Sequence, residues 1–409
     1  MWTDETRNYL TTTIFYVHRD WKLVKRVLST SQFDSSAAKS GEAFKNLLVG
    51  NLYGFGLDPS SICNLVYVTV PDPMITSALN TFRRLDCGSA VIDKVLDITF
   101  DTDYLTKQAP EVLKVLTTST VIVTCMKQSG LIQDIPSSFI KKEKHKTWSV
   151  KLEMLMFVRE HYDLINQTVF PQEETENLIS PIHLDILIFL IEFLQPFKQA
   201  IDDLEDFHYP TINLVLPWYC KLLKHTQSAI NDTCMMSAIK SKCHMTIKEN
   251  FSIHILHKTA TFLWPEFKCL KMISKSEQEE VHNAIRNMIS QEKMDSKEDL
   301  VNDPEQPEKK PKISFSEWED NNELNDEVSN YINLNTVMSD ERDLLSWWSC
   351  KTKIYPGLSK IARSILAIPA SSCSTDSTTS LSVKAFRDRR SILTSDTIDG
   401  ILFLHSNLG

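Results

Sequence analysis

Glycine is scarce in this chain, which has only nine glycines among 409 residues. Loops that bind phosphate groups need closely spaced glycines, so the scarcity argues against such a loop and favours a helix-rich chain. The nine cysteines are scattered, and no two of them form a Cys-x-x-Cys pair. This pattern is typical of reduced thiols in the cytosol or nucleus, and it offers no clustered ligands for a structural zinc ion.

Long apolar runs and an excess of positive charge are also missing. No run reaches the roughly 18 apolar residues that a membrane-spanning helix needs. The richest run, residues 184–194, is too short and contains Asp185 and Glu192. The net charge is −9, so a basic footprint over the whole chain is absent and only a local patch is open to nucleic acid. We therefore expect no membrane association, and nucleic-acid binding that is at most weak and strongly salt-dependent.

The first hundred residues combine strand and helix patterns. Residues 8–17 are rich in Thr, Ile, Tyr and Val, residues 21–28 alternate apolar and basic side chains, and together they predict a β-hairpin. Residues 40–52 have helical apolar spacing, and residues 64–70 form a continuous apolar run that is typical of a buried strand. A helix is expected over 74–85. The order β-β-α-β-α indicates a mixed α/β sheet.

The middle of the chain is helical in character, and a polar segment then separates it from an apolar terminus. Apolar side chains recur at i, i+3 and i+4 in five segments, which are 148–167, 183–205, 212–227, 235–252 and 277–289. Residues 290–328 are dominated by Lys, Glu, Asp, Asn and Pro, as expected of a disordered linker. Residues 343–408 hold the densest apolar pattern of the chain, with Trp347 and Trp348 beside it. Such a segment must pack on its own core or on a second chain, and for the two tryptophans both remain open.

Several motifs in this terminus resemble the C-terminal dimerisation region of the hAT transposases and of the host proteins derived from them. The matching pieces are Leu345-Ser346-Trp347-Trp348, Tyr355-Pro356-Gly357-Leu358, Ala362-Arg363, Ile368-Pro369-Ala370-Ser371-Ser372, Arg389-Arg390 and Ile401-Leu402-Phe403-Leu404. Weaker echoes lie upstream, at 194–197, at 209–217 and at 262–268, where Trp264 replaces the family's aspartate. The likeness extends over nearly the whole chain and is loose before residue 180.

The resemblance implies an α/β fold, namely a ribonuclease H-like core that a large all-helical insertion interrupts and that C-terminal helices complete. Four segments follow from it: residues 1–104 as the first part of the core, 105–289 as the insertion, 290–328 as the acidic, Lys/Pro-containing linker, and 329–409 as the dimerisation region. The residues expected to form the dimerisation surface are Leu345, Trp347, Trp348, Tyr355, Pro356, Leu358, Leu366, Ile368, Pro369, Leu402 and Phe403.

Catalysis in this family uses three acidic residues that hold two divalent metal ions, whose oxygen ligands apolar residues cannot replace. The first acid would lie two residues before Trp2, and so falls outside this sequence. The second would follow Val68-Thr69, where Val70 stands. The third position carries Asp376 in place of a glutamate, and Ser377 follows it in place of an arginine. The family's Cys/His cluster is reduced to Cys87 with Ala90 at a histidine position, and its zinc finger is missing.

We therefore expect a catalytically inactive, domesticated relative without cofactor or metal. It would act in the nucleus by homodimerisation or by pairing with a hAT-like partner, in a role related to transcription. The alternatives are a residual metal-dependent nuclease with a compensating acid (Asp4, Asp72 or Asp86), a DNA-binding regulator that needs a partner, and a decaying element without function. Asp72 is more typical of a turn, and Asp376 of a loop or cap, than of a metal ligand. Cys243-His244 with His254 and His257 is more typical of packing than of a zinc site.

Overall fold

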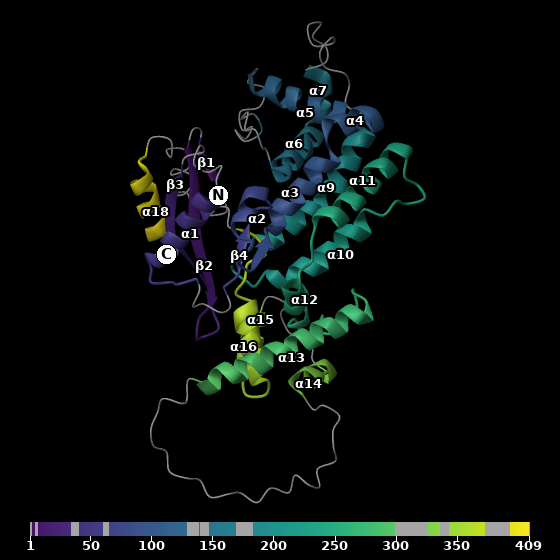
Figure 1. Ribbon diagram of the computed structural model, residues 1–409. Coiled ribbons are helices and arrows are strands. Elements are labelled where there is room, and N and C mark those ends of the chain that lie inside the picture. Colours follow the sequence, from purple (N-terminus) through teal and green to yellow (C-terminus); the bar gives the residue numbers. More distant parts are fainter. Residues whose placement is uncertain are drawn as a thin grey trace, which may run out of the picture.

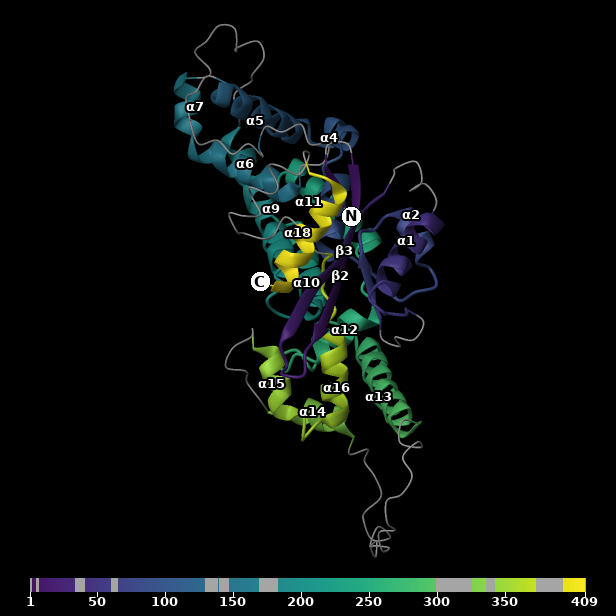
Figure 2. The same ribbon diagram turned by 90° about the vertical axis from the view of Figure 1, so that its left-hand side faces the viewer.

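The computed structural model describes residues 2–4, 7–33, 41–59, 65–128, 139, 147–168, 183–298, 326–335, 343–372 and 393–408. Figures 1 and 2 show a small sheet on one side, a group of helices beside it, and a second group of helices below both. In the described part of the chain, no helix is long and apolar enough to cross a membrane.

The larger sheet consists of three antiparallel strands in the order β1 (Trp2–Asp4), β2 (Arg7–Val17) and β3 (Leu23–Phe33). β2 and β3 form the hairpin that the sequence predicts, with a bulge between Thr12 and Thr13. Its turn contains Trp21 at φ 64°, a left-handed conformation that is uncommon for a bulky residue. The Trp21 side chain is buried there, and the Arg363 guanidinium lies 4.7 Å from its ring centre.

A separate sheet of two short parallel strands follows, formed by β4 (Tyr67–Thr69) and β5 (Arg84–Asp86). The helix α1 (Gly41–Tyr53) precedes them and α2 (Pro73–Ala78) connects them. The predicted strand at 64–70 is therefore confirmed in its second half. The predicted helix over 74–85 is wrong beyond Ala78, because residues 84–86 pair with β4 and this tertiary pairing outweighs the local helical spacing.

The larger core surrounds the long helix α9 (Leu184–Leu204), whose apolar residues run around most of its circumference. Its neighbours are α3 (Gly88–Thr99), α4 (Thr102–Gln108), α5 (Pro110–Gln128), α6 (Trp148–Glu160), α7 (Tyr162–Thr168), the 3-10 helix η3 (Ile212–Leu214), α10 (Val215–His225) and α11 (Cys234–Asn250). Those from residue 148 onward match predicted amphipathic segments, whereas the helices between residues 88 and 128 correspond to none of the five. This core draws on residues 91–251, with Ala370 added from the C-terminal part.

A second core joins the end of the middle region to the C-terminal region. Its helices are α12 (Ile255–Phe262), α13 (Lys275–Glu298), α14 (Glu327–Asn333), α15 (Leu344–Lys351) and α16 (Pro356–Ile365). α12 and α13 thus share their apolar faces with α14 to α16, although the sequence groups them with the insertion. α13 continues to Glu298, past residue 290 where the sequence places the start of the linker, and most of that linker lies outside the described residues.

The junction of α3 and α6 contains a carboxyl group with an unusual environment. Asp93 accepts a hydrogen bond from the Trp148 backbone N–H at 3.1 Å, and Asp97 accepts one from the Trp148 indole at 2.8 Å. Burial raises the pKa of Asp93 to about 6, and the nearby Asp97 carboxylate adds to this effect. The Asp93 side chain therefore binds a proton more tightly in the folded chain than in the unfolded chain.

We expect Asp93→Asn to stabilise the chain by about 1–2 kcal/mol at pH 7.5 and to have little effect at pH 4. The folded-state pKa is raised, so the wild-type chain loses stability as the pH rises from about 4 through 6, and the neutral amide removes that loss. Urea unfolding at both pH values measures it, with the exposed Asp103→Asn on α4 as the control. Equal responses of the two variants would contradict this account of Asp93.

Candidate functional site

The carboxyl edge of β4 and β5 is where the family resemblance places the second catalytic acid. Val70 follows β4 there, and its side chain packs on the small core of α1 and α2. The Asp72 carboxylate accepts hydrogen bonds from the N–H groups of Met74 (2.8 Å) and Ile75 (3.1 Å), so it caps α2. The Asp86 carboxylate lies 2.6 Å from the Arg84 guanidinium. Both candidate compensating acids at this edge are thus engaged in local structure.

The sequence singles out two other acids, Asp376 at the third catalytic position and Asp4 as a compensating acid. Asp376 and the side chain of Asp4 lie outside the described residues. Among the described residues, no group of three or more His, Cys, Asp or Glu side chains could hold a metal ion.

The segment after α16 returns to this edge and binds the start of α3, so it connects the C-terminal region to the N-terminal region. The Gly88 N–H donates to the Ala370 carbonyl at 2.8 Å, and the Ser89 N–H donates to the Ser371 hydroxyl at 3.1 Å. A Cβ on Gly88 would lie only 3.2 Å from the Ala370 carbonyl oxygen and 3.1 Å from Leu204. Glycine therefore permits the close approach of the C-terminal segment to the start of α3.

Inside the C-terminal region, α14 and α16 are linked by a charged cap. Both Glu327 oxygens accept hydrogen bonds from the first turn of α16, from Gly357 N–H at 3.1 Å and from Leu358 N–H at 2.9 Å. A carboxylate at a helix N-terminus pairs with unsatisfied N–H groups and with the positive end of the helix dipole. Gly357 also leaves room for this approach, because a Cβ there would lie 2.9 Å from Ile289.

The opposite end of α14 is capped by Lys268, the lysine of the segment 262–268 that echoes the family. Its buried ammonium donates to the carbonyl of Tyr331 at 3.0 Å and to the carbonyl of Leu334. Sequence spacing gives no sign of this bond, because the partners are about sixty residues apart.

We expect Lys268→Met to cost about 2 kcal/mol of unfolding free energy, since it keeps the side-chain length but leaves buried carbonyl groups unpaired. Urea unfolding measures the effect, and the exposed Lys271→Met is the matched control. A Lys268 variant as stable as this control would show that the α14 cap contributes nothing.

The structure separates the predicted dimerisation residues into two groups. Leu345, Trp348, Tyr355, Leu358 and Leu366 are buried in the second core. The others keep part of their surface free, namely Trp347, Pro356, Ile368, Pro369, Leu402 and Phe403. The surface of the first group is already covered within one chain, so the prediction of a dimer contact stays open mainly for the second group.

The last helix, α18 (Ser395–Leu408), covers the outer edge of β3 (Figures 1 and 2). The N–H groups of Thr30 and Val27 donate to Asp399 (2.6 Å) and to the Ser406 hydroxyl (2.8 Å), and Asn407 donates to the Val27 carbonyl (3.0 Å). These side chains satisfy backbone groups that an open edge strand would offer to another chain.

The opposite face of α18 is apolar and exposed. Ile401, Leu404 and Leu408 are 39%, 53% and 80% exposed, and their spacing of three and four residues places them on one helix face. Phe403 lies on the side of α18 that carries Asp399 and Asn407, and it stacks on Phe55 with ring centres 6.2 Å apart. Phe55 and the neighbouring Tyr53 are themselves 45% and 56% exposed. We call the exposed row of Ile401, Leu404 and Leu408 the α18 surface.

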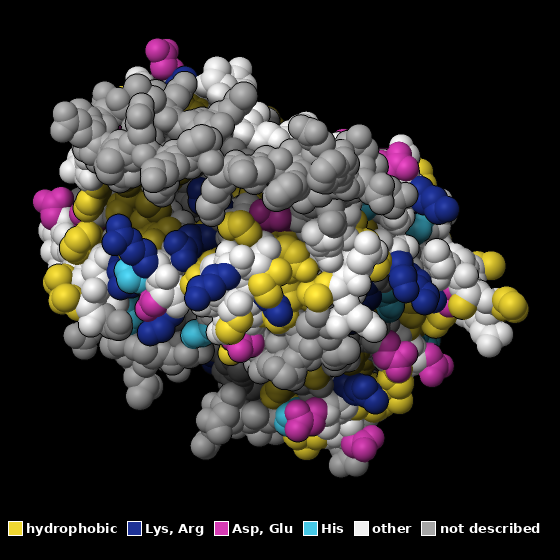
Figure 3. All heavy atoms as spheres, turned by 90° about the horizontal axis from the view of Figure 1, so that it is seen from below, with side chains coloured by type: hydrophobic (Ala, Val, Ile, Leu, Met, Phe, Trp, Pro, Cys, Tyr) yellow, Lys and Arg dark blue, Asp and Glu magenta, His cyan; other side chains and the backbone are white. Residues whose placement is uncertain are grey.

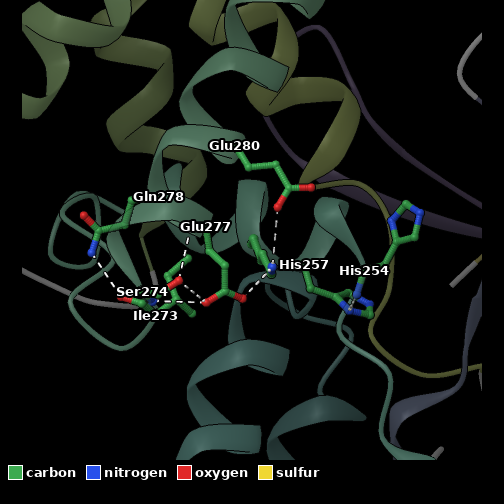
Figure 4. A network of polar contacts seen from close by, with 8 residues as sticks. His254, His257, Ile273, Ser274, Glu277, Gln278 and Glu280 are labelled. Atoms are coloured by element: carbon green, nitrogen blue, oxygen red, sulfur yellow. Dashed lines mark hydrogen bonds and ion pairs between the residues drawn. The ribbon is translucent and has the colours of Figure 1, made fainter.

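Two histidines that the sequence marks as a weak zinc candidate are instead the N-terminal cap of α12 (Figure 4). The His254 N–H donates to Nδ1 of His257 at 3.2 Å, and the Leu256 N–H donates to Nδ1 of His254 at 3.1 Å. Next to them, Lys258 binds Glu277 of α13 at 2.8 Å. This ion pair, with the Ser274 hydrogen bonds, lowers the pKa of Glu277 to about 2. The cluster joins α12 to α13.

Comparison with known proteins supports the family resemblance. Residues 327–408 match the hAT family C-terminal dimerisation region, so the chain contains a region of this type. It is 28% identical over 354 residues to Zinc finger protein 618 of Homo sapiens and, equally, to that of Mus musculus, covering 84% of this chain and 36% of each relative. It is 25% identical over 432 residues to the Transposable element Hobo transposase of Drosophila melanogaster, covering 91% of this chain and 63% of the relative. The chain thus spans about a third of the length of the first two relatives.

Proposed function

We propose that this chain is a catalytically inactive, transposase-derived protein that acts in the nucleus by self-association through residues 327–408. The observation that carries the proposal is the matched dimerisation region, whose last helix presents an exposed apolar face. A zinc finger protein and a transposase among its relatives support a nuclear role in regulation, in which DNA contact would require a partner.

The geometry of α18 favours its outer face as the contact between two copies. Asp399, Ser406 and Asn407 lie on the face that binds β3, while Ile401, Leu404 and Leu408 lie on the other face. The helix is thus fixed to its own chain by polar bonds and leaves its apolar row for a partner. This row provides aliphatic contacts of the kind found in the buried centre of protein interfaces.

The core is proposed to be ribonuclease H-like. The chain order supports this proposal: a three-stranded antiparallel sheet is followed by α1 and then by the parallel pair of β4 and β5. Residues 370–372 also lie against the start of α3. Loss of catalysis is supported by Val70 at an acid position and by the local engagement of Asp72 and Asp86. A site of this kind needs several free carboxylates around two ions.

We expect Ile401→Glu combined with Leu404→Glu to weaken self-association at least 100-fold, because two charges would be buried in an apolar contact. Sedimentation velocity at micromolar concentration measures it. The exposed Met245→Glu on α11 is the control, and it should leave association unchanged. Unaltered association of the double variant would exclude the α18 surface as the contact.

The second candidate is a residual metal-dependent nuclease, which the alignment with Hobo transposase over 91% of the chain favours. Incubation of the chain with duplex DNA and Mg²⁺ or Mn²⁺ separates the two proposals. The first predicts no cleavage. Metal-dependent cleavage that Asp86→Asn or Asp376→Asn abolishes would establish the second.

A further inference from the structure

A cavity of about 340 Å³ lies where α9 meets α10 and the start of α11, away from the dimerisation region. Its lining residues are Asp185, Ile188, Phe189, Glu192, Phe193, His225, Asp232, Met236 and Lys240. Its volume is in the range of pockets that bind small ligands or single side chains. Nothing in the dimerisation proposal uses it.

The apolar side of the cavity is aromatic. The rings of Phe189 and Phe193 lie 5.7 Å apart, and the ring of Phe193 lies 5.5 Å from that of His225. The His225 Nε2–H donates to the Phe193 carbonyl at 3.0 Å, and burial lowers the pKa of His225. The imidazole is therefore neutral at pH 7, and the aromatic side of the cavity carries no positive charge.

The polar side of the cavity is negatively charged. Lys240 contacts both carboxylate oxygens of Asp232, at 2.7 and 2.9 Å, so these two charges neutralise each other. Asp185 and Glu192 are seven residues apart on α9 and share a face. Neither makes an ion pair within the part of the chain that the structure describes. Two carboxylates thus face a cavity whose own cation is already paired.

We propose that this cavity binds one cationic side chain, a guanidinium or an alkylammonium group, of a basic peptide segment. The carboxylates of Asp185 and Glu192 attract the charge, while Phe189 and Phe193 receive the side-chain stem and add cation–π attraction. The aromatic floor favours such an organic cation over a bare metal ion, which would need converging oxygen ligands.

Methionine-methyl NMR of the full chain tests the proposal, because Met236 lines the cavity and the chain has only twelve methionines. The probes are the Nα-acetyl amides of arginine, lysine and the neutral norleucine, with spermidine as a free amine. The Met236 resonance, assigned with Met236→Leu, should shift and saturate with the arginine or lysine amide at millimolar concentration. Norleucine amide should bind at least tenfold more weakly.

The variants Asp185→Asn and Glu192→Gln keep the shape of the cavity and remove its charge. Each should weaken binding of the cationic amide at least threefold, whereas Glu153→Gln, an exposed carboxylate on α6, should not. Unchanged methionine resonances elsewhere show that the variants are folded. Absence of a saturable shift, equal binding of norleucine amide, or clear preference for spermidine over both amides would each overturn the proposal. Unaltered binding by the variant that combines Asp185→Asn with Glu192→Gln would also overturn it.

Discussion

Replacement of Trp348 by alanine is expected to cost about 4 kcal/mol of unfolding free energy, while Trp347→Ala costs about 1 kcal/mol. Trp348 is fully buried, and its indole N–H donates to the Leu263 carbonyl at 2.9 Å. Its ring also contacts Tyr331, with ring centres 5.4 Å apart. Its removal therefore leaves a large cavity and an unpaired carbonyl in the core that joins α12 to the C-terminal helices.

Trp347 is the matched control for this prediction, because it is adjacent in sequence and differs mainly in burial. It is only partly buried, and it contacts Tyr331 and Trp348 edge to face. Urea unfolding of the two single variants measures the difference. Equal losses of stability would contradict the assignment of Trp348 to the intrachain core, and a loss of dimer without loss of stability in Trp348→Ala would place that residue in the interface instead.

Acidification from pH 7 to pH 4.5 is expected to remove about 2–3 kcal/mol of stability through His257 alone. Burial, and then the nearby His254, lower the pKa of His257 to about 3 in the folded chain. The unfolded chain binds the proton near pH 6.5, so this contribution is complete above that pH and is lost as the pH falls toward 3. Protonation also turns Nδ1 from an acceptor into a donor, which breaks the hydrogen bond from the His254 N–H.

The measurement is urea unfolding at pH 7 and 4.5 in an Asp93→Asn background, because Asp93 contributes with the opposite sign in this range. His257→Leu should flatten the dependence of stability on pH. It also removes the hydrogen bond that the His254 N–H donates to His257. The exposed His208→Leu serves as control and should leave the dependence unchanged. A His257 variant with the wild-type slope would contradict the role assigned to the buried imidazole.

The periodicity of apolar residues predicts the elements whose pattern lies within one continuous segment of the sequence. The hairpin of β2 and β3 and the long helix α9 follow from alternating and helical apolar spacing, which the burial of their side chains explains. The strand β5 could not be predicted in this way, because three residues are too few to show a periodic pattern. They form a strand because they pair with β4. Sequence spacing also treats Trp347 and Trp348 alike, since the direction of each ring depends on contacts with distant segments.

The candidate site shows the same division between local and distant causes. The motifs in 345–404 identify the type of dimerisation region, because they are contiguous patterns. They do not show that α18 binds the edge of β3 through Asp399, Ser406 and Asn407, because those bonds connect residues that are 369 to 380 positions apart. For the same reason, only the structure separates the exposed row of Ile401, Leu404 and Leu408 from the residues that build the core.

The most direct test of self-association is the mass of the unmodified chain, measured by sedimentation equilibrium at about 1–50 micromolar. This range covers the dissociation constants of weak to moderate dimers. The account predicts a concentration-dependent approach to twice the chain mass of 46.9 kDa. A mass of 46.9 kDa throughout this range would contradict it.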